Sequence, residues 1–133
     1  MQAIILAGGK GTRLYPLTLN VPKPMVPIGD KPFLYYLLLM LKKEGVSKVI
    51  FSIGYLGEQI KDYFSDSWNG LELIYVTEKE PLGTGGAIAV CMDQVSEDNV
   101  FVINGDTFCS VNLKELLSSH QQQEAEISIA LKE

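Results

Sequence analysis

A glycine-rich loop near the start of the chain has the composition of a phosphate-binding loop. It follows an apolar segment, residues 3–7, and its residues are Gly8, Gly9, Lys10, Gly11, Thr12 and Arg13. Three glycines within four residues allow positive φ angles and a close backbone approach, so several N–H groups can face an anion. A Walker A loop would need Lys followed by Ser or Thr, and the dinucleotide-binding fingerprint would need a glycine where Leu14 stands. A glycine-rich turn without a ligand is the alternative.

A lysine held between prolines is the second candidate for chemistry. Lys23 lies between Pro22 and Pro24 in a segment, residues 16–27, that contains four prolines. Because each proline fixes its own φ and restricts its predecessor, we expect a rigid backbone at Lys23 and a side chain that reaches outward. Lys23 follows Arg13 by ten residues, so the two are candidates for fixed cations beside a phosphate. The alternative is a surface lysine in a stiff loop.

Two later loops each carry a carboxylate. Residues 78–88 combine Glu78 with a run of glycines at the expected start of a helix. The alternative for this loop is an N-terminal turn that packs closely on its helix. Residues 104–107 place Asp106 just past an apolar strand, where an oxygen ligand for a hard cation such as Mg²⁺ is expected. The alternative for Asp106 is a turn residue or a helix cap.

The elements that must position these loops alternate between strand and helix patterns. The predicted strands are residues 3–7, 49–53, 71–76, 100–103 and 126–131. The predicted helices are residues 33–44, 58–65 and 84–95, and one that begins at the capping-box-like pair Asn112 and Glu115. This order predicts a mostly parallel sheet that is covered on both faces. Ligands bind such sheets beyond the carboxyl ends of the strands, which is where the three loops begin.

Composition narrows the function classes. The chain has 133 residues, 47% of them hydrophobic, which fits one globular domain with a substantial core. A net charge of −5 and a single arginine argue against nucleic acid as a partner. Cys91 and Cys109 lack CxxC spacing, which excludes a zinc ribbon or a disulfide scaffold and predicts two reduced thiols. The longest apolar stretch, residues 33–41, is far below the ~20 residues of a bilayer span. We therefore expect a soluble, cytoplasmic protein without a membrane partner.

The motifs together resemble those of the sugar-1-phosphate nucleotidyltransferases. The resemblance rests on Leu-Ala-Gly-Gly-x-Gly-Thr-Arg-Leu at residues 6–14, Pro-Lys-Pro at 22–24 and Gly-Asp at 105–106. Within the family, residues 81–88 and 104–108 are most similar to guanylyltransferases that act on D-glycero-D-manno-heptose 1-phosphate. Mannose-1-phosphate guanylyltransferases are the next most similar group. The resemblance implies a three-layer α/β/α Rossmann-like fold.

The resemblance also implies a reaction and a set of site residues. A nucleoside triphosphate, expected to be GTP, and a sugar 1-phosphate would give an NDP-sugar and pyrophosphate, with Mg²⁺ as cofactor. Arg13, Lys23 and Asp106 would be catalytic, and Asp106 would hold the metal. The nucleotide-binding residues would be Leu6, Ala7, Gly8, Gly9, Gly11, Thr12, Arg13, Glu78, Gly83, Thr84 and Gly85. His120 is expected to be an ordinary surface residue.

The departure from the family is length, since its catalytic domains are longer than this chain. We expect residues 1–133 to be the N-terminal nucleotide-binding part of a single domain, truncated after about five strands. An uncovered sheet edge or face would then favour a homo-oligomer. Two alternatives stay open: a mannose-1-phosphate or other hexose-1-phosphate nucleotidyltransferase, and a catalytically incomplete nucleotide- or sugar-phosphate-binding subunit.

Overall fold

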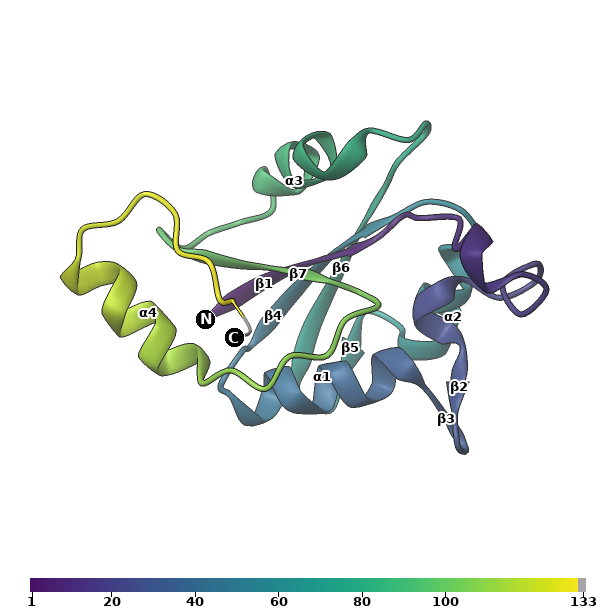
Figure 1. Ribbon diagram of the computed structural model, residues 1–133, viewed down its shortest axis with the longest axis horizontal. Coiled ribbons are helices and arrows are strands. Elements are labelled where there is room, and N and C mark those ends of the chain that lie inside the picture. Colours follow the sequence, from purple (N-terminus) through teal and green to yellow (C-terminus); the bar gives the residue numbers. More distant parts are fainter. Residues whose placement is uncertain (132–133) are drawn as a thin grey trace.

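A five-stranded sheet forms the centre of the computed structural model, which describes residues 1–131 (Figure 1). Its strand order is β5-β6-β4-β1-β7. The strands are β1 (Gln2–Ala7), β4 (Lys48–Ile53), β5 (Ser67–Trp68), β6 (Leu71–Thr77) and β7 (Val100–Asn104). All neighbours are parallel except β5, which is antiparallel to β6. The predicted mostly parallel sheet is therefore confirmed.

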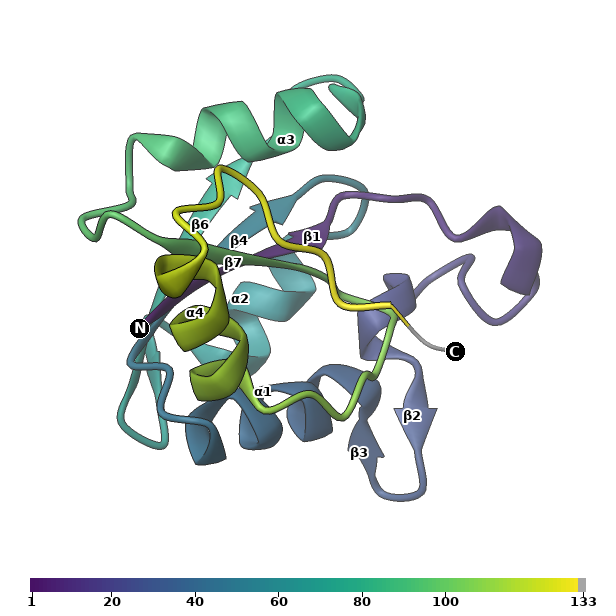
Figure 2. The same cartoon turned by 60° about the vertical axis from the view of Figure 1, so that its left-hand side comes forward.

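Helices cover both faces of the sheet, so the predicted three-layer architecture is also confirmed. Helix α3 (Gly83–Met92) lies on one face, where its buried Cys91 packs with Ile4 and Ile50. The other face is covered by α1 (Phe33–Lys43) and α2 (Glu58–Phe64), while α4 (Leu113–Gln122) lies beside it and buries Leu113. Figures 1 and 2 show α3 and α1 on opposite sides of the strands.

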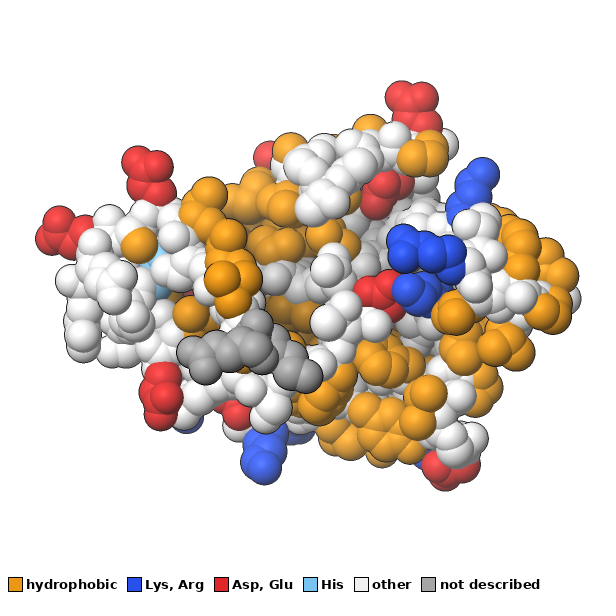
Figure 3. Space-filling view, in the orientation of Figure 1, with side chains coloured by type: hydrophobic (Ala, Val, Ile, Leu, Met, Phe, Trp, Pro, Cys, Tyr) orange, Lys and Arg blue, Asp and Glu red, His pale blue; other side chains and the backbone are white. Residues whose placement is uncertain are grey.

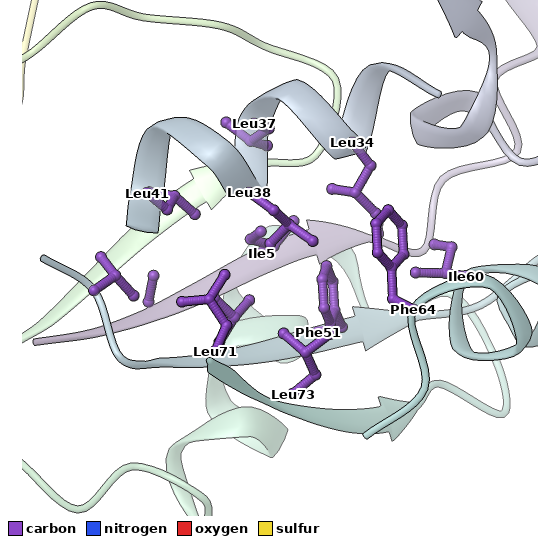
Figure 4. Close-up of a cluster of buried hydrophobic side chains, with 14 of the residues drawn as sticks. Ile5, Leu34, Leu37, Leu38, Leu41, Phe51, Ile60, Phe64, Leu71 and Leu73 are labelled. Carbon is purple, nitrogen blue, oxygen red and sulfur yellow. The ribbon is translucent and has the colours of Figure 1, made fainter. Parts of the chain in front are cut away.

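The larger core lies between the sheet and α1. Helix α1 buries Leu34, Leu37, Leu38 and Leu41, a spacing that places them on one helical face. They meet sheet residues such as Phe51 and side chains from α2 (Figure 4). Because β1 is covered on both faces, its residues 3–7 form a continuous apolar run rather than an alternating one.

The long loop between β1 and α1 contains short elements that the sequence did not predict. They are two 3₁₀ turns, η1 (Thr12–Leu14) and η2 (Lys23–Met25), and a small hairpin of β2 (Pro27–Ile28) and β3 (Lys31–Pro32). The strand β5 was also not predicted. Its Trp68 packs edge-on against Phe64 and Tyr35, so tertiary aromatic contacts accompany this two-residue strand.

The predicted strand at residues 126–131 is wrong. The chain is irregular there, and Ile127 and Ile129 are 79% and 72% exposed. Figure 2 shows this segment leaving α4 without joining the sheet. Alternation specifies two faces of a possible strand but supplies no partner, and among residues 1–131 no strand pairs with this segment. The cap of α4 is confirmed, because the Asn112 side chain accepts a hydrogen bond from the Glu115 N–H at 3.1 Å.

Membrane-spanning helices are absent from residues 1–131, since none of the helices there has both the length and the apolar content required.

Strand β7 has an open edge, which generates a prediction about self-association. It pairs only with β1 among the described residues, and its Val102 is 44% exposed. We expect the chain to self-associate through this edge, and Val102→Lys to weaken the self-association constant roughly tenfold, because lysine on an edge strand blocks edge-to-edge pairing. Light scattering over a concentration series would measure this. Val90→Lys on α3, where Val90 is 39% exposed, is the control and should change nothing. Equal effects of the two substitutions would contradict the prediction.

Candidate functional site

A cleft of about 440 Å³ opens at the carboxyl ends of the parallel strands. Its lining residues are Leu6, Ala7, Gly8, Gly9, Lys10, Gly11, Thr12, Arg13, Lys23, Pro24, Glu78, Pro81, Gly83, Thr84, Asn104 and Asp106. The three loops singled out in the sequence therefore meet, and every predicted site residue except Gly85 lines the cleft. Gly85 lies exposed in the first turn of α3. Figure 3 shows basic side chains gathered beside an acidic one on this face.

The glycine-rich loop is closed by a buried threonine. Thr18 is fully buried, and its Oγ1 donates to the Gly11 carbonyl oxygen at 2.7 Å. Gly11 has φ of +63°, and a Cβ there would lie 3.0 Å from Lys23 Cβ and 3.2 Å from Thr18 Cγ2. Glycine is thus required at this position for both backbone conformation and space. Sequence analysis did not identify Thr18, since nothing in its local pattern distinguishes it from other loop threonines.

Lys23 and Asp106, which are 83 residues apart in the chain, form an ion pair in the cleft. Lys23 Nζ donates to Asp106 Oδ2, while Thr107 Oγ1 donates to Asp106 Oδ1 at 3.2 Å. Partial burial raises the pKa of the Asp106 carboxyl. The hydrogen bond and the charge of Lys23 lower it, and so do hydrogen bonds from Thr107 and from the Asp106 backbone. Together they outweigh burial, so the pKa lies below its ordinary value. Asp106 is thus held ionised, facing the cleft.

Backbone packing sets the positions of both partners. Lys23 lies in η2 between Pro22 and Pro24, which are both buried. Gly105 donates its N–H to the Leu6 carbonyl oxygen at 2.9 Å, and a Cβ at Gly105 would lie 3.0 Å from that oxygen. The glycine before Asp106 therefore lets the end of β7 lie directly against β1.

Glu78 is anchored through its backbone and its side chain. Its N–H donates to the Ile53 carbonyl oxygen at 2.8 Å, which continues the β4–β6 pairing one residue past β6. Ser52 Oγ donates to Glu78 Oε1 at 2.6 Å, and the Leu82 N–H donates to Oε2 at 3.3 Å. A Cβ at Gly8 would lie only 2.5 Å from Oε1, so the carboxylate lies directly against the glycine-rich loop.

The sequence patterns did not identify Ser52, which lies in β4, or Gly54, which directly follows β4. Ser52 is fully buried and is the one polar residue of the apolar segment 49–53, a signal that was available but not used. A Cβ at Gly54 would lie 2.8 Å from the Gly8 carbonyl oxygen, so Gly54 makes room for the glycine-rich loop. This close approach joins residues distant in sequence and leaves no local pattern.

Asp106 is the candidate metal ligand. Within residues 1–131, no group of three or more His, Cys, Asp or Glu side chains is arranged to hold a metal ion. The Asp106 carboxylate, which lines the cleft, is an oxygen donor of the kind that fits a hard cation. Mg²⁺ commonly binds in this way, through one or two carboxylates plus substrate phosphates.

The remaining candidate groups differ in whether they can contact a ligand in the cleft. Arg13 is exposed on η1 and makes no ion pair with the described residues, so its charge is available to a ligand. Cys91 and Cys109 are both free thiols. Burial raises the pKa of the Cys91 thiol, which disfavours the reactive thiolate. His120 lies on α4 outside the cleft lining.

Comparisons with known proteins agree with the geometry of the cleft. The pattern of the family described as "Nucleotidyl transferase" matches residues 2–133. The chain belongs to the nucleotidyl transferase family. Its resemblance to the sugar-1-phosphate nucleotidyltransferases is thereby confirmed as homology.

Two curated relatives and one solved structure illustrate how similar this nucleotidyl transferase is to known members. D-glycero-alpha-D-manno-heptose 1-phosphate guanylyltransferase of Aneurinibacillus thermoaerophilus is 46% identical over 99% of this chain and 57% of that protein. Mannose-1-phosphate guanylyltransferase of Mycobacterium tuberculosis is 42% identical over 98% of this chain and 37% of that protein. The structure of HddC from Yersinia pseudotuberculosis complexed with GMP-PN has a TM-score of 0.80 and 40% identity, covering 90% of this chain and 53% of that one. The chain spans 57% or less of the length of each of these three proteins.

The contact between Gly54 and Gly8 generates a prediction about the loop. Gly54→Ala is expected to lower the free energy of unfolding by about 1–3 kcal/mol, because the new methyl group must push the backbone carbonyl of Gly8 away. Gly9→Ala is the control, since a Cβ at Gly9 has nothing within 4 Å. Urea denaturation of the two variants and the wild type would measure the difference. Similar stabilities of the two variants would contradict this close approach.

Proposed function

We propose that the protein transfers a nucleotidyl group to a sugar 1-phosphate and releases pyrophosphate, for the synthesis of surface polysaccharide. The observation that carries the proposal is one cleft that combines a glycine-rich loop, three basic side chains and an ionised aspartate. Homology to guanylyltransferases of sugar 1-phosphates supports the same reaction. In this proposal residues 1–133 are the N-terminal, nucleotide-binding part of a single catalytic domain.

The proposed chemistry matches the residues that line the cleft. A phosphate oxygen of the sugar 1-phosphate attacks the α-phosphorus of the triphosphate. The bond from that phosphorus to the bridging oxygen breaks, and pyrophosphate leaves with the electron pair. The attacking oxygen is already anionic, so the reaction needs alignment and charge neutralisation rather than a strong base. The cleft lining accordingly contains basic side chains and glycines but no His or Cys.

Each charged group has a proposed role. Arg13 binds the triphosphate and stabilises charge on the transferring phosphoryl group. Lys23 lies between the nucleotide and the sugar phosphate, which requires it to exchange Asp106 for phosphate oxygens. Asp106 would then bind Mg²⁺, which when present supplies positive charge beside the phosphates.

GTP is the proposed nucleotide. The Glu78 carboxylate lines the cleft and can only accept hydrogen bonds when ionised. The edge of guanine presents two neighbouring donors, N1–H and N2–H, whereas uracil and thymine present carbonyl oxygens that a carboxylate repels. A heptose 1-phosphate of the D-glycero-D-manno configuration is the proposed acceptor, and mannose 1-phosphate is the second candidate because its guanylyltransferases are similarly close relatives.

Pyrophosphate release over a panel of substrates tests the proposed reaction. The panel pairs GTP, ATP, UTP and CTP with heptose, mannose and glucose 1-phosphates, for this chain and for any longer product of the same gene. The expected result is release that depends on both substrates and is fastest with GTP. Nucleotide binding without release from any pair would instead indicate a binding subunit.

Removing either cation is expected to slow turnover. Arg13→Ala and Lys23→Ala should each lower kcat roughly a hundredfold, because one preorganised charge contact to the transition state is worth ~3 kcal/mol. Asp106→Asn should lower kcat and weaken activation by Mg²⁺. Steady-state kinetics in the catalytically competent protein would measure all three. Lys114→Ala, on α4 and outside the cleft lining, is the control. Near-normal kcat in a cleft variant would remove that residue's proposed role.

The base assignment generates a separate prediction. Glu78→Gln should reduce the preference for GTP over UTP roughly thirtyfold, because a charged hydrogen-bonded contact contributes about 2–3 kcal/mol. Glu80→Gln, in the same exposed segment but outside the cleft lining, should leave the preference unchanged. Competition assays with GTP and UTP present together, run on the wild type and on each variant, would measure the ratio of the two rates. A wild-type preference for UTP would contradict the assignment of guanine as the base but would leave the proposed nucleotidyl transfer unaffected.

A further inference from the structure

A buried hydroxyl beneath the cleft has one carboxylate as its partner. Ser52 is 0% exposed and lies in β4 among apolar residues, with β1 on one side and β6 on the other. A hydroxyl in such a place is unfavourable unless it is hydrogen-bonded. Its Oγ donates to Glu78 Oε1 at 2.6 Å, the oxygen that also lies against Gly8.

We propose that Ser52 is a positioning residue that sets nucleotide specificity by fixing the Glu78 carboxylate in the cleft. The inference rests on the proposed function, in which Glu78 contacts the base. Ser52 itself is buried below the cleft lining and would act only through Glu78. A glutamate side chain without this anchor would occupy several rotamers, and few of them would present both oxygens to a base.

The hydrogen bonds around Glu78 also determine that its carboxylate offers only hydrogen-bond acceptors to the cleft. Ser52 Oγ–H donates to Oε1 and the Leu82 N–H donates to Oε2. Each carboxylate oxygen keeps a lone pair for a second donor, so the group is an acceptor toward the cleft at both oxygens. This arrangement selects a ligand edge with two adjacent N–H donors. An amide at this position would have to turn its NH₂ toward Ser52, because a hydroxyl can accept a hydrogen bond and the Leu82 N–H cannot.

The preference for GTP over UTP shows whether Ser52 positions Glu78 or only stabilises the fold, because a loss of stability alone would not change that preference. The affinities of GTP and UTP are measured by displacement of a fluorescent GTP analogue from this chain. Ser52→Ala is expected to lower the GTP-to-UTP preference about tenfold, the factor that corresponds to one lost hydrogen bond to a charged group. Ile50→Val is the matched control, because Ile50 is equally buried, lies two residues before Ser52 in β4 and has no polar atom in its side chain. It should lower thermal stability and leave the preference unchanged.

A double-mutant cycle completes the test. If Ser52 acts through Glu78, Ser52→Ala has no further effect on the preference in the Glu78→Gln background. Ser52→Cys keeps a side chain of similar size with a weak donor, so it should lower the preference too, and it replaces the alanine variant if that variant does not fold. A preference that changes in Glu78→Gln but not in Ser52→Ala or Ser52→Cys overturns the positioning role and leaves the guanine assignment standing. A preference unchanged in Glu78→Gln overturns both.

Discussion

Parallel pairing of β1 with β4 on one side and β7 on the other is the interaction on which the cleft depends. The β1–β7 ladder continues one residue past β7, through Gly105 N–H to the Leu6 oxygen, and the β4–β6 ladder continues one residue past β6, through Glu78 N–H to the Ile53 oxygen. The first of these hydrogen bonds places Asp106, the residue after Gly105, at the same edge of the sheet as the glycine-rich loop. The second places Glu78 there. The register of a buried sheet is strongly specified, so these charges are positioned by the core rather than by flexible loops.

Charge in the cleft is distributed in a way that suits an anionic ligand. The chain as a whole carries −5, yet Lys10, Arg13 and Lys23 line this edge together with the glycine-rich loop. Asp106 pairs with Lys23, and about a third of each side chain remains exposed. The pair therefore stays within reach of solvent and can exchange partners when a phosphate group arrives. A fully buried pair would resist such an exchange because separating it would leave a desolvated charge.

Sequence patterns predicted the parts of the fold whose information is local. Helix α1 and strand β1 follow from leucine spacing and from an apolar run, and the loops stand out because glycine, proline and aspartate follow apolar strands. Ser52 and Gly54 matter through contacts with Glu78 and Gly8, which only the assembled sheet creates. The segment at 126–131 shows the opposite case, since a strand pattern without a neighbouring strand gives no strand.

Nucleotide binding at this edge of the sheet is most directly tested by amide chemical shifts. GTP with Mg²⁺ is titrated into ¹⁵N-labelled protein, and the shift of each backbone amide is followed. The predicted result is that the largest changes fall on Gly8, Gly9, Gly11 and Asp106, whose backbone would contact or adjoin the phosphates. Changes confined to the separate hollow between residues 96–101 and α4, with none in the glycine-rich loop, would contradict a nucleotide site in the cleft.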